Sequence, residues 1–504
     1  MGSGIRAPSP GLTRRPYYDF SGLDASRDDT ALDTGRGQAL VRCENAFCDW
    51  RGQIVKEAAV FKRGTNDSKI NHVAFFARDR VAWAQQDGGG HLTLNSDSGH
   101  TVIDAFPPNS VVSSTVFNQK LHFACIGQPM YVYNGSVWSK NTSGLQSGPS
   151  AISTIQRRLV ASGMQGRPTE LHFSRVDNEN VMPDDEPISS TDVTKGAIID
   201  LKNIIGTADK IVGHGQFESN RLAIFTEDQA IIYVVSPNYT QWAIDEKANI
   251  RTGCISHRTI AQAGSDLIFC SRAGVHTLRR SVDNALQLYS VPMSDRIDYL
   301  YRALVRSVDD PSKISAVWDQ DEGQYHIFFP RPGGELSNRL TWTQHPKDTE
   351  LSKWSTGTTF NARCGAFLGG KLVYGTNGGV YEAAKVEALA SDVEDGVFPT
   401  AVIETPTLWH GSLTEWKDTH SFVLHATGYG QIQVEATDDD GRAINSFVID
   451  VLQEGDDSFP DIPLSQQYER KFEHRYRGVR FRFTVTGTGL VRIIGFVVNL
   501  KQRA

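Results

Sequence analysis

Three short stretches of this sequence place acidic residues at spacings that could support chemistry. The first is DQDEG, residues 319–323, which has the Asp-x-Asp-x-Gly spacing of a calcium-binding loop. A complete EF-hand-type loop also needs a third ligand at its fifth position and a bidentate Glu at its twelfth, but Gly323 and Phe329–Pro330 stand near those places. Because the segment lies between two apolar runs, we predict a hairpin turn here and no metal site.

The second stretch is the acidic cluster Asp184, Asp185 and Glu186 in the polar segment 177–192. A glycosidase needs two carboxylates about 5–10 Å apart on opposite sides of the scissile bond, one of them with a raised pKa. Adjacent acids in a polar loop that contains Pro remain solvated and ionised. We therefore predict that this segment is a solvated loop.

The third stretch is NSDSGHTV, residues 95–102. It nearly matches the Ser-x-Asp-x-Gly-x-Thr-Trp box of sialidase-type propellers, with Asn95 in place of Ser and Val102 in place of Trp. That box is a structural turn, so the match predicts a hairpin. The 14 histidines are scattered, and no H-E-x-x-H, G-x-S-x-G or P-loop motif occurs. We predict no catalytic, cofactor-binding or metal site, no cofactor, and a protein that is not an enzyme.

The composition is that of an ordinary folded protein, with 504 residues, of which 39 % are hydrophobic and 22 % charged. The formal net charge of -7 disfavours a chain that grips nucleic acid by its bulk charge. The six cysteines form no C-x-x-C pair, which disfavours zinc, and we expect reduced, buried thiols in a protein made in a cytoplasm. No signal-peptide core and no long apolar run occur, so we expect no transmembrane helix.

One stretch, residues 468–483, is both strongly basic and rich in aromatic residues. Its cationic side chains could follow a phosphate backbone while the aromatic rings stack on bases. From Val479 to Val485, however, apolar residues alternate with Arg and Thr, which favours an ordinary β-strand with one solvated face. A charged contact with a partner protein or DNA is the alternative.

Strand signals dominate the rest of the chain: short runs rich in Val, Ile, Phe, Tyr and Thr, bounded by Gly, Asn, Asp and Ser. A unit of apolar run, turn and second apolar run recurs at roughly 40–60 residues, as blades of a β-propeller do. Such hairpins are predicted at residues 73–85, 120–140, 158–176, 221–245, 255–278, 313–330 and 364–384. The uneven spacing indicates an all-β, degenerate propeller of six to eight blades, and a series of β-sandwiches is the competing interpretation.

We predict three parts: an extended N-terminal arm over residues 1–34, a β-propeller over 35–390 and a C-terminal β-sandwich over 391–504. The last boundary rests on an acidic segment with little strand pattern, after which period-2 alternation returns. One helix is predicted over 294–310, with apolar residues at i, i+3 and i+4 spacing and Ser294 as its N-cap. We expect this helix to pack on the rim of the fold, and a subunit contact is the alternative.

Several segments resemble, in the same order, the tail nozzle and tail tubular proteins of short-tailed bacteriophages. GCISHRTIAQAGSDLIFCSRAGVHTL, residues 253–278, is similar to a family segment with an s-hrsiv start, a g-d-lyfls strand and an r-G-v turn. Further segments that carry the resemblance lie at 35–63, 209–235, 316–330, 402–411 and 476–498. The sequence is shorter than some family members, which contain additional inserted domains.

The resemblance implies a non-catalytic structural protein that assembles, usually as a homo-hexameric ring, below the portal and adaptor of the virion. Its partners would be other copies of itself, the tail adaptor, other tail proteins such as fibres, and packaged double-stranded DNA. Made in the host cytoplasm, it would continue the DNA channel of the virion tail and gate genome ejection. Loops 177–192 and 331–350 are candidate gates, because loops on a rigid scaffold commonly carry function.

Two other functions stay open from the residues alone. A propeller joined to a sandwich could be a binding module of a tail appendage that recognises a cell-surface glycan or receptor through a shallow pocket with exposed aromatic rings. An enzyme of the sialidase or polysaccharide-lyase kind would need an arginine cluster or paired acids at the centre of the blades. No motif in the sequence indicates such a cluster.

Overall fold

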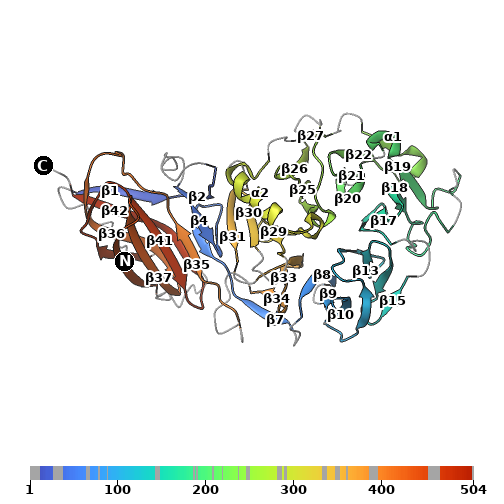
Figure 1. Ribbon diagram of the computed structural model, residues 1–504, viewed down its shortest axis with the longest axis horizontal. Coiled ribbons are helices and arrows are strands. Elements are labelled where there is room, and N and C mark those ends of the chain that lie inside the picture. Colours follow the sequence, from blue (N-terminus) through green and yellow to red (C-terminus); the bar gives the residue numbers. More distant parts are fainter. Residues whose placement is uncertain are drawn as a thin grey trace, which may run out of the picture. The chain divides into compact units, whose positions relative to one another are not determined.

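The computed structural model shows an all-β protein (Figure 1). It describes residues 12–26, 38–63, 68–77, 80–87, 89–141, 148–185, 188, 191–206, 209–217, 220–236, 238–245, 250–280, 286–288, 292–331, 338–346, 352–358, 361–384, 396–451 and 466–501. Two compact units are present. The propeller unit comprises Lys62–Arg339 and Phe360–Glu382, and the sandwich unit comprises Met1–Phe61, Leu340–Thr359 and Ala383–Ala504.

The propeller unit is built of six four-stranded blades and one further hairpin. The first three blades are β8 (Ile70–Ala77), β9 (Arg80–Gln86), β10 (Leu92–Ser96) and β11 (Val102–Phe106); β12 (Val112–Phe117), β13 (Lys120–Cys125), β14 (Gln128–Tyr133) and β15 (Trp138–Lys140); and β16 (Ala151–Ile155), β17 (Arg158–Met164), β18 (Arg167–Phe173) and β19 (Ala197–Asp200). The next two are β20 (Ile211–Phe217), β21 (Arg221–Thr226), β22 (Ala230–Val234) and β23 (Ala243–Ile244); and β24 (Ala261–Ala263), β25 (Asp266–Cys270), β26 (Val275–Arg280) and β27 (Leu286–Leu288). The hairpin is β28 (Ser315–Asp319) with β29 (Gln324–Phe329), and the last blade is β32 (Cys364–Leu368), β33 (Lys371–Thr376), β34 (Gly379–Ala383) and β7 (Val60–Arg63).

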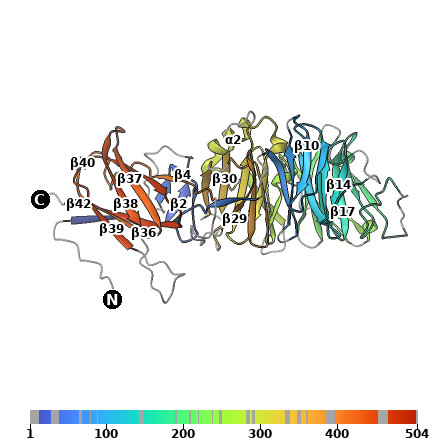
Figure 2. The ribbon, with the colours of Figure 1, turned by 90° about the horizontal axis from the view of Figure 1, so that it is seen from below.

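The blades form a closed ring around a centre (Figure 1). The first strand of each blade contacts the first strand of the next, in the order β8, β12, β16, β20, β24, β28, β32 and back to β8. Figure 2 shows blade strands such as β10, β14 and β17 from the side of this ring. The predicted hairpins at 73–85 through 364–384 are all present, and the predicted degenerate propeller of six to eight blades is confirmed.

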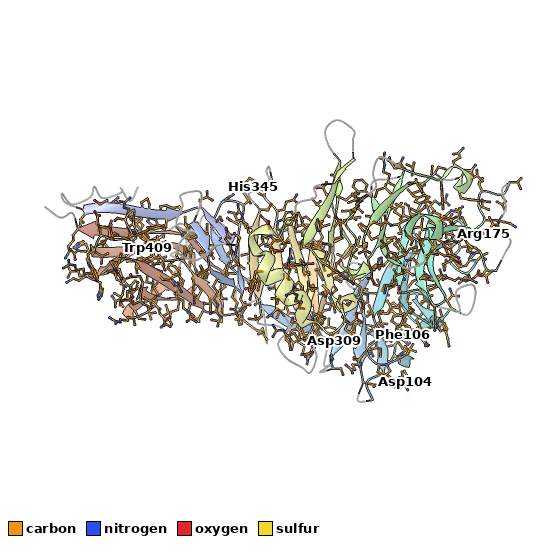
Figure 3. The ribbon with its side chains drawn as sticks, turned by 45° about the horizontal axis from the view of Figure 1, so that its top comes forward. Asp104, Phe106, Arg175, Asp309, His345 and Trp409 are labelled. Atoms are coloured by element: carbon orange, nitrogen blue, oxygen red, sulfur yellow. The ribbon has the colours of Figure 1, made fainter. Side chains whose placement is uncertain are left out.

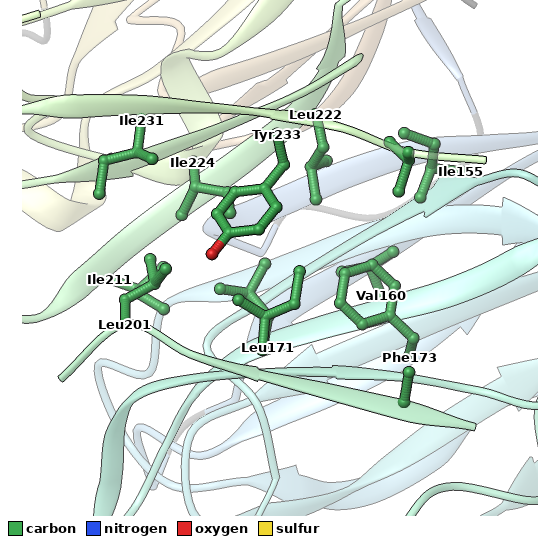
Figure 4. Packing of buried hydrophobic residues seen from close by; sticks show 13 residues of the cluster. Ile155, Val160, Leu171, Phe173, Leu201, Ile211, Leu222, Ile224, Ile231 and Tyr233 are labelled. Carbon is green, nitrogen blue, oxygen red and sulfur yellow. The ribbon is translucent and has the colours of Figure 1, made fainter. Parts of the chain in front are cut away.

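Each blade buries its two faces against its neighbours, as the interface between the third and fourth blades illustrates (Figure 4). Leu171 and Phe173 of β18 meet Leu222 and Ile224 of β21, all with no solvent exposure. Alternate residues of one strand point to opposite faces, so both sets must be apolar when both faces are covered. This explains why the blade strands read as nearly continuous apolar runs.

Truncation of Leu171 to Ala tests this packing. We expect Leu171→Ala to lower the free energy of unfolding by about 2–5 kcal/mol, because the neighbouring blade cannot collapse fully into the space left behind. Ile103→Ala on β11 is the control, since Ile103 is 74 % exposed and its truncation should change stability by less than about 0.5 kcal/mol. Chemical denaturation measures both values, and equal effects of the two substitutions would contradict the interface.

An N-terminal strand closes the ring, because β7 is the outer strand of the last blade. Arg63 at the end of β7 forms ion pairs with Glu382 of β34 (2.7 Å) and with Asp97 in the turn after β10 (2.9 Å). Asp97 also accepts a hydrogen bond from the backbone N–H of Val81 at the start of the first blade. Arg63 therefore connects the last blade to the first.

The sandwich unit contains two packed sheets and a short parallel pair. One sheet has the order β39 (Gln466–Lys471), β36 (Lys417–Gly428), β42 (Val491–Lys501), β6 (Ile54–Lys56) and β5 (Ala46–Cys48), with β1 (Leu12–Tyr18) on β42 and β40 (Arg475–Tyr476) on β36. The other contains, in order, β31 (Lys353–Gly357), β4 (Arg42–Glu44), β35 (Ala401–Glu404), β41 (Val479–Thr486), β37 (Gly430–Asp438) and β38 (Ala443–Val451). The parallel pair is β2 (Phe20–Leu23) and β3 (Gln38–Leu40), and β30 (Asn338–Thr343) spans the boundary between the units.

Aromatic rings fill the space between the two sheets of the sandwich. Phe422 of β36 lies 5.4 Å from Phe496 of β42, ring centroid to centroid, and 5.1 Å from Phe481 of β41 in the opposite sheet. Strand β41 alternates between buried and half-buried residues, so the predicted strand with one solvated face is confirmed within 468–483.

The membership of the two units differs from the predicted boundaries at residues 34 and 390. Strands β3 to β6, within residues 38–56, and strand β31 belong to the sandwich unit and not to the propeller. Within the described part of the predicted arm, β1 pairs with β42 from Leu12 to Tyr18, and β2 pairs with β3. Pairing between strands hundreds of residues apart produces this arrangement, and a local change in composition does not reveal such pairing.

The predicted helix is present as the 3-10 turn η5 (Asp295–Ile297) followed by α2 (Asp298–Ser307). Its apolar face is buried through Tyr301 and Leu304. Ser294 occupies the N-cap position of η5, as predicted, but its side chain makes no capping hydrogen bond, because its hydroxyl accepts one from the backbone N–H of Val275 on β26. Other helical segments among the described residues are α1 (Lys202–Ile205), η2 (Tyr239–Gln241), η4 (His257–Thr259) and η6 (Pro311–Lys313).

All six cysteines are buried free thiols, as predicted. Within the described part of the chain, no helix combines the length and apolarity needed to cross a membrane.

Candidate functional site

The DQDEG segment forms the turn between β28 and β29, as predicted. The Asp319 carboxylate accepts hydrogen bonds from the backbone N–H groups of Asp321 (3.0 Å) and Glu322 (3.2 Å). Burial of Asp319 raises the pKa of its carboxyl group above the ordinary value. The acid thus stabilises a turn, and the described residues contain no group of three or more His, Cys, Asp or Glu that could hold a metal.

The other two acidic stretches also form turns and loops. NSDSGHTV links β10 to β11, and Gly99 supplies the positive φ of 80° in that turn. In the loop after β18, Asp184 forms an ion pair with Arg167 at 2.8 Å, and Asp185 accepts a hydrogen bond from the backbone N–H of Met182. Glu186 lies outside the described residues.

The described part of loop 177–192 is held firmly onto the propeller. Buried Glu179 pairs with Lys120 of β13 at 2.7 Å and accepts a hydrogen bond from Asn118. The fully buried guanidinium of Arg158 donates hydrogen bonds to the carbonyl oxygens of Ser174, Lys195 and Val193 around the ends of this loop. These contacts fix the loop from both sides.

A basic cavity of about 270 Å³ lies in the propeller unit, and the sequence motifs did not indicate it. Its charged lining residues are Lys69, Arg258, Asp309, Lys313, Arg331 and Arg363. Five of these six side chains are cationic and one is acidic, so they carry a formal charge of 5 − 1 = +4. This excess stands against a net charge of -7 for the whole chain.

The fold gathers these cations at one end of the central strands. Lys69 immediately precedes β8, Arg363 immediately precedes β32, and Lys313 lies two residues before β28. Arg258 belongs to η4, just before β24, and Arg331 follows β29, which returns antiparallel to the start of β28. In a propeller the innermost strands run in the same direction along the axis, so residues before them meet at one rim.

Among the described residues of this lining Asp309 is the single acid, and it follows the end of α2 (Figure 3). Its carboxylate lies 2.6 Å from the ammonium of Lys313, which pairs with it.

A basic residue shortly before an inner strand is the sequence signal that could have located the cavity. It occurs in DSKI (67–70), HRTI (257–260), SKIS (312–315) and NARC (361–364).

Burial and positive charges close together in the cavity raise the free energy of the charged forms of Lys69 and Arg363, and so lower the pKa of each side chain. Burial lowers the pKa of Lys69, and the nearby cations of Arg363 and Lys313 lower it further. Burial likewise lowers the pKa of Arg363, where Arg258 adds a repulsive charge. Cys364 supplies no compensating anion, because burial raises the pKa of its thiol.

The two arginines are oriented by hydrogen bonds to the protein. An Nη2 proton of Arg258 is donated to the backbone carbonyl of Asn71 at 2.8 Å, and Nη1 of Arg363 donates to the side chain of Asn377 at 3.3 Å. The Nε atoms of both arginines are buried and have no hydrogen-bond partner among the described residues.

A second cavity of about 160 Å³ shares Arg258 with the basic cavity and is lined by the central strands. His72 of β8 lies 2.7 Å from the hydroxyl of Ser114, and the ring of His257 lies 5.3 Å from that of His214 on β20. Nε2 of His257 is 3.1 Å from the carbonyl oxygen of Ile152, so this nitrogen carries the donated proton. Burial lowers the pKa of His257 to about 4.

Comparisons with known proteins add little to this geometry. No protein-family model matches the sequence, and no curated protein is significantly similar to it. The extracellular domain of the putative hybrid two component system BT4673 from B. thetaiotaomicron matches 66 % of this chain at 8 % identity and a TM-score of 0.41. AFV00434, an ancestral GH74 enzyme, matches 73 % at 9 % identity and a TM-score of 0.38, and a glycoside hydrolase matches 86 % at 11 % identity and a TM-score of 0.28.

The chain spans 40 % of the first of these structures, 53 % of the second and 100 % of the third. All three TM-scores are below 0.5, so these likenesses bear on neither activity nor ligand. The chemistry of the site follows from its own residues. Cations that outnumber acids in a small, partly buried cavity can hold an anionic group.

Two histidines of the propeller unit, His257 in η4 and His276 on β26, predict a pH-dependent stability. The pKa values of His257 and His276 are lowered by burial to about 4 in the folded protein, against about 6.5 in an unfolded chain. The unfolded chain therefore binds these protons first, so stability is complete above about pH 6.5 and falls toward pH 4. We expect a loss of up to about 1.4 kcal/mol per pH unit for each such histidine.

Urea denaturation between pH 7.5 and 5 measures this loss. The range avoids most of the titration of carboxylates, which would otherwise add their own slope. His257→Gln should flatten the dependence relative to the unchanged protein. A free energy of unfolding that is constant over this range would show that the buried histidines accept protons without penalty.

Proposed function

We propose that this chain is a structural protein of a bacteriophage tail, the nozzle that lies below the portal and adaptor and gates genome ejection. The observation that carries the proposal is the order of the segments that resemble the tail nozzle family. Residues 209–235 correspond to β20–β22, 253–278 to η4 and β24–β26, and 316–330 to β28–β29. Residues 476–498 correspond to β41 and most of β42 in the sandwich unit. The likeness therefore follows successive structural units of the chain.

The charge of the chain supports a conduit for a polyanion. A ring of subunits that each carry a net charge of -7 has few uncompensated cations available to retain DNA phosphates strongly. Closed cyclic symmetry is the common route by which identical chains form such rings. The expected partners are other copies of this chain, the adaptor, other tail proteins such as fibres, and double-stranded DNA in transit.

Native mass spectrometry with negative-stain images of the purified full chain tests the assembly. We expect a ring of about six copies with an axial hole, alone or after mixing with tail adaptor, because closed cyclic rings satisfy every subunit interface. Mixing with an unrelated ring protein controls for nonspecific association. A strict monomer under both conditions would contradict the nozzle.

A cell-surface glycan or receptor-binding propeller is the second candidate, and the basic cavity on the propeller axis favours it. A pocket with convergent polar groups on a rigid scaffold is a common ligand site. This function predicts a monomer or trimer that binds acidic glycans on an array and does not form a ring. Ring formation with no signal on the array would dismiss this candidate, and array binding by a strict monomer would favour it over the nozzle.

A further inference from the structure

We propose that the basic cavity at the axis of the propeller unit binds the oxyanion group of a small ligand, a phosphate, sulfate or carboxylate. This inference rests on the residues of the cavity and holds under either function proposed above. The cavity is contained within the propeller unit, since all its lining residues belong to that unit.

The charge of the cavity is unbalanced. Lys69, Arg258 and Arg363 are each affected by neighbouring cations or by burial in the direction that disfavours their charged forms. Among the described lining residues Asp309 is the one carboxylate, and it is already paired with Lys313 at 2.6 Å. Charges brought together in a partly buried place are costly unless a counter-charge accompanies them. An anion in the cavity supplies that counter-charge.

The cavity also contains hydrogen-bond donors without partners among the described residues. The Nε–H groups of Arg258 and Arg363 are buried without a hydrogen-bond partner among the described residues. Buried donors are rarely left unpaired in proteins. An oxyanion accepts several hydrogen bonds at once, and a guanidinium presents donors in a planar fork that suits carboxylate and phosphate oxygens. An oxyanion in the cavity would supply acceptors for the donors of these two arginines.

The size of the cavity limits the ligand. Its volume of about 270 Å³ lies just below the range for small-molecule sites, which is roughly 300–1,000 Å³. It admits an anionic group with a few attached atoms. A DNA duplex is excluded, because its major groove alone is about 12 Å wide. The ligand is thus a free oxyanion or the acidic end group of a saccharide.

Isothermal titration of the full chain with inorganic phosphate, sulfate and glucuronate, each at matched ionic strength with chloride as the background anion, tests the proposal. We expect saturable binding of at least one of them, and glucose should not bind because it carries no charge. Phosphate or sulfate without glucuronate identifies a free tetrahedral oxyanion. Binding of glucuronate identifies an acidic saccharide. Absence of saturation by all three anions overturns the proposal.

Two substitutions that should change the affinity for the anion in opposite directions locate the site. Lys69→Gln removes one cation and should weaken binding about tenfold, because it removes a charge-assisted contact. Asp309→Asn removes the one acid and should tighten binding about threefold, because it removes a repulsive charge. Lys140→Gln is the matched control for the charge change, since Lys140 is an exposed residue of β15 away from the cavity lining, and it should leave affinity unchanged.

Thermal unfolding separates binding from a merely structural role. Without anion, Lys69→Gln should raise or preserve Tm, because the substitution relieves repulsion with Arg363 and Lys313. Saturating phosphate should raise the Tm of Lys69→Gln by less than it raises the Tm of the unchanged protein, since the variant binds phosphate more weakly in its folded state. A lower Tm for Lys69→Gln without anion, together with an unchanged phosphate effect, would show that Lys69 serves the fold alone.

Discussion

The fold depends on the need of every blade to cover both of its faces. A four-stranded blade has an apolar side toward each neighbour, and an isolated hairpin or small sheet is marginally stable in water. Closure into a ring satisfies every face at once. The last blade is completed by β7 from upstream of the first blade, and Arg63 joins Glu382 to Asp97 across that closure. Ring closure therefore links the stability of each blade to that of all the others.

Closure also determines where chemistry can occur. The innermost strands run in the same direction, so the residues that precede them meet at one rim of the axis. Lys69, Lys313 and Arg363 hold such positions before three different inner strands. Close to these cations, burial lowers the pKa of His214 on β20 and of His257 in η4, so both histidines stay neutral at neutral pH. The same ring of inner strands thus brings basic side chains and neutral histidines together.

Local features of this fold could be predicted from the sequence, and its long-range features could not. The turn at DQDEG and the alternation in β41 each depend on residues close together in the chain. The membership of β4 in the sandwich depends on its pairing with β35, in which Val402 lies opposite Glu44, more than 350 residues away in the chain. Ser294 has the residue type of an N-cap, but a neighbouring strand competes for its hydroxyl. The basic cavity could not be predicted because its cations come from separate repeats and are far apart in the sequence.

The positive charge of the cavity favours binding of a small anion, and the negative net charge of the chain disfavours binding of a long polyanion. The two properties are compatible. Electrostatic interactions between exposed charges fade over about 8–10 Å in physiological salt. Under the nozzle function that we propose, a net charge of -7 weakens the attraction between the outside of the subunit and DNA or another polyanion. The lining residues of the partly enclosed cavity carry a formal charge of +4. This charge acts on a ligand only a few ångströms away, where salt screens the interaction less. A chain can thus let a long polyanion pass while holding a small anion, because the first property belongs to its surface and the second to its axis.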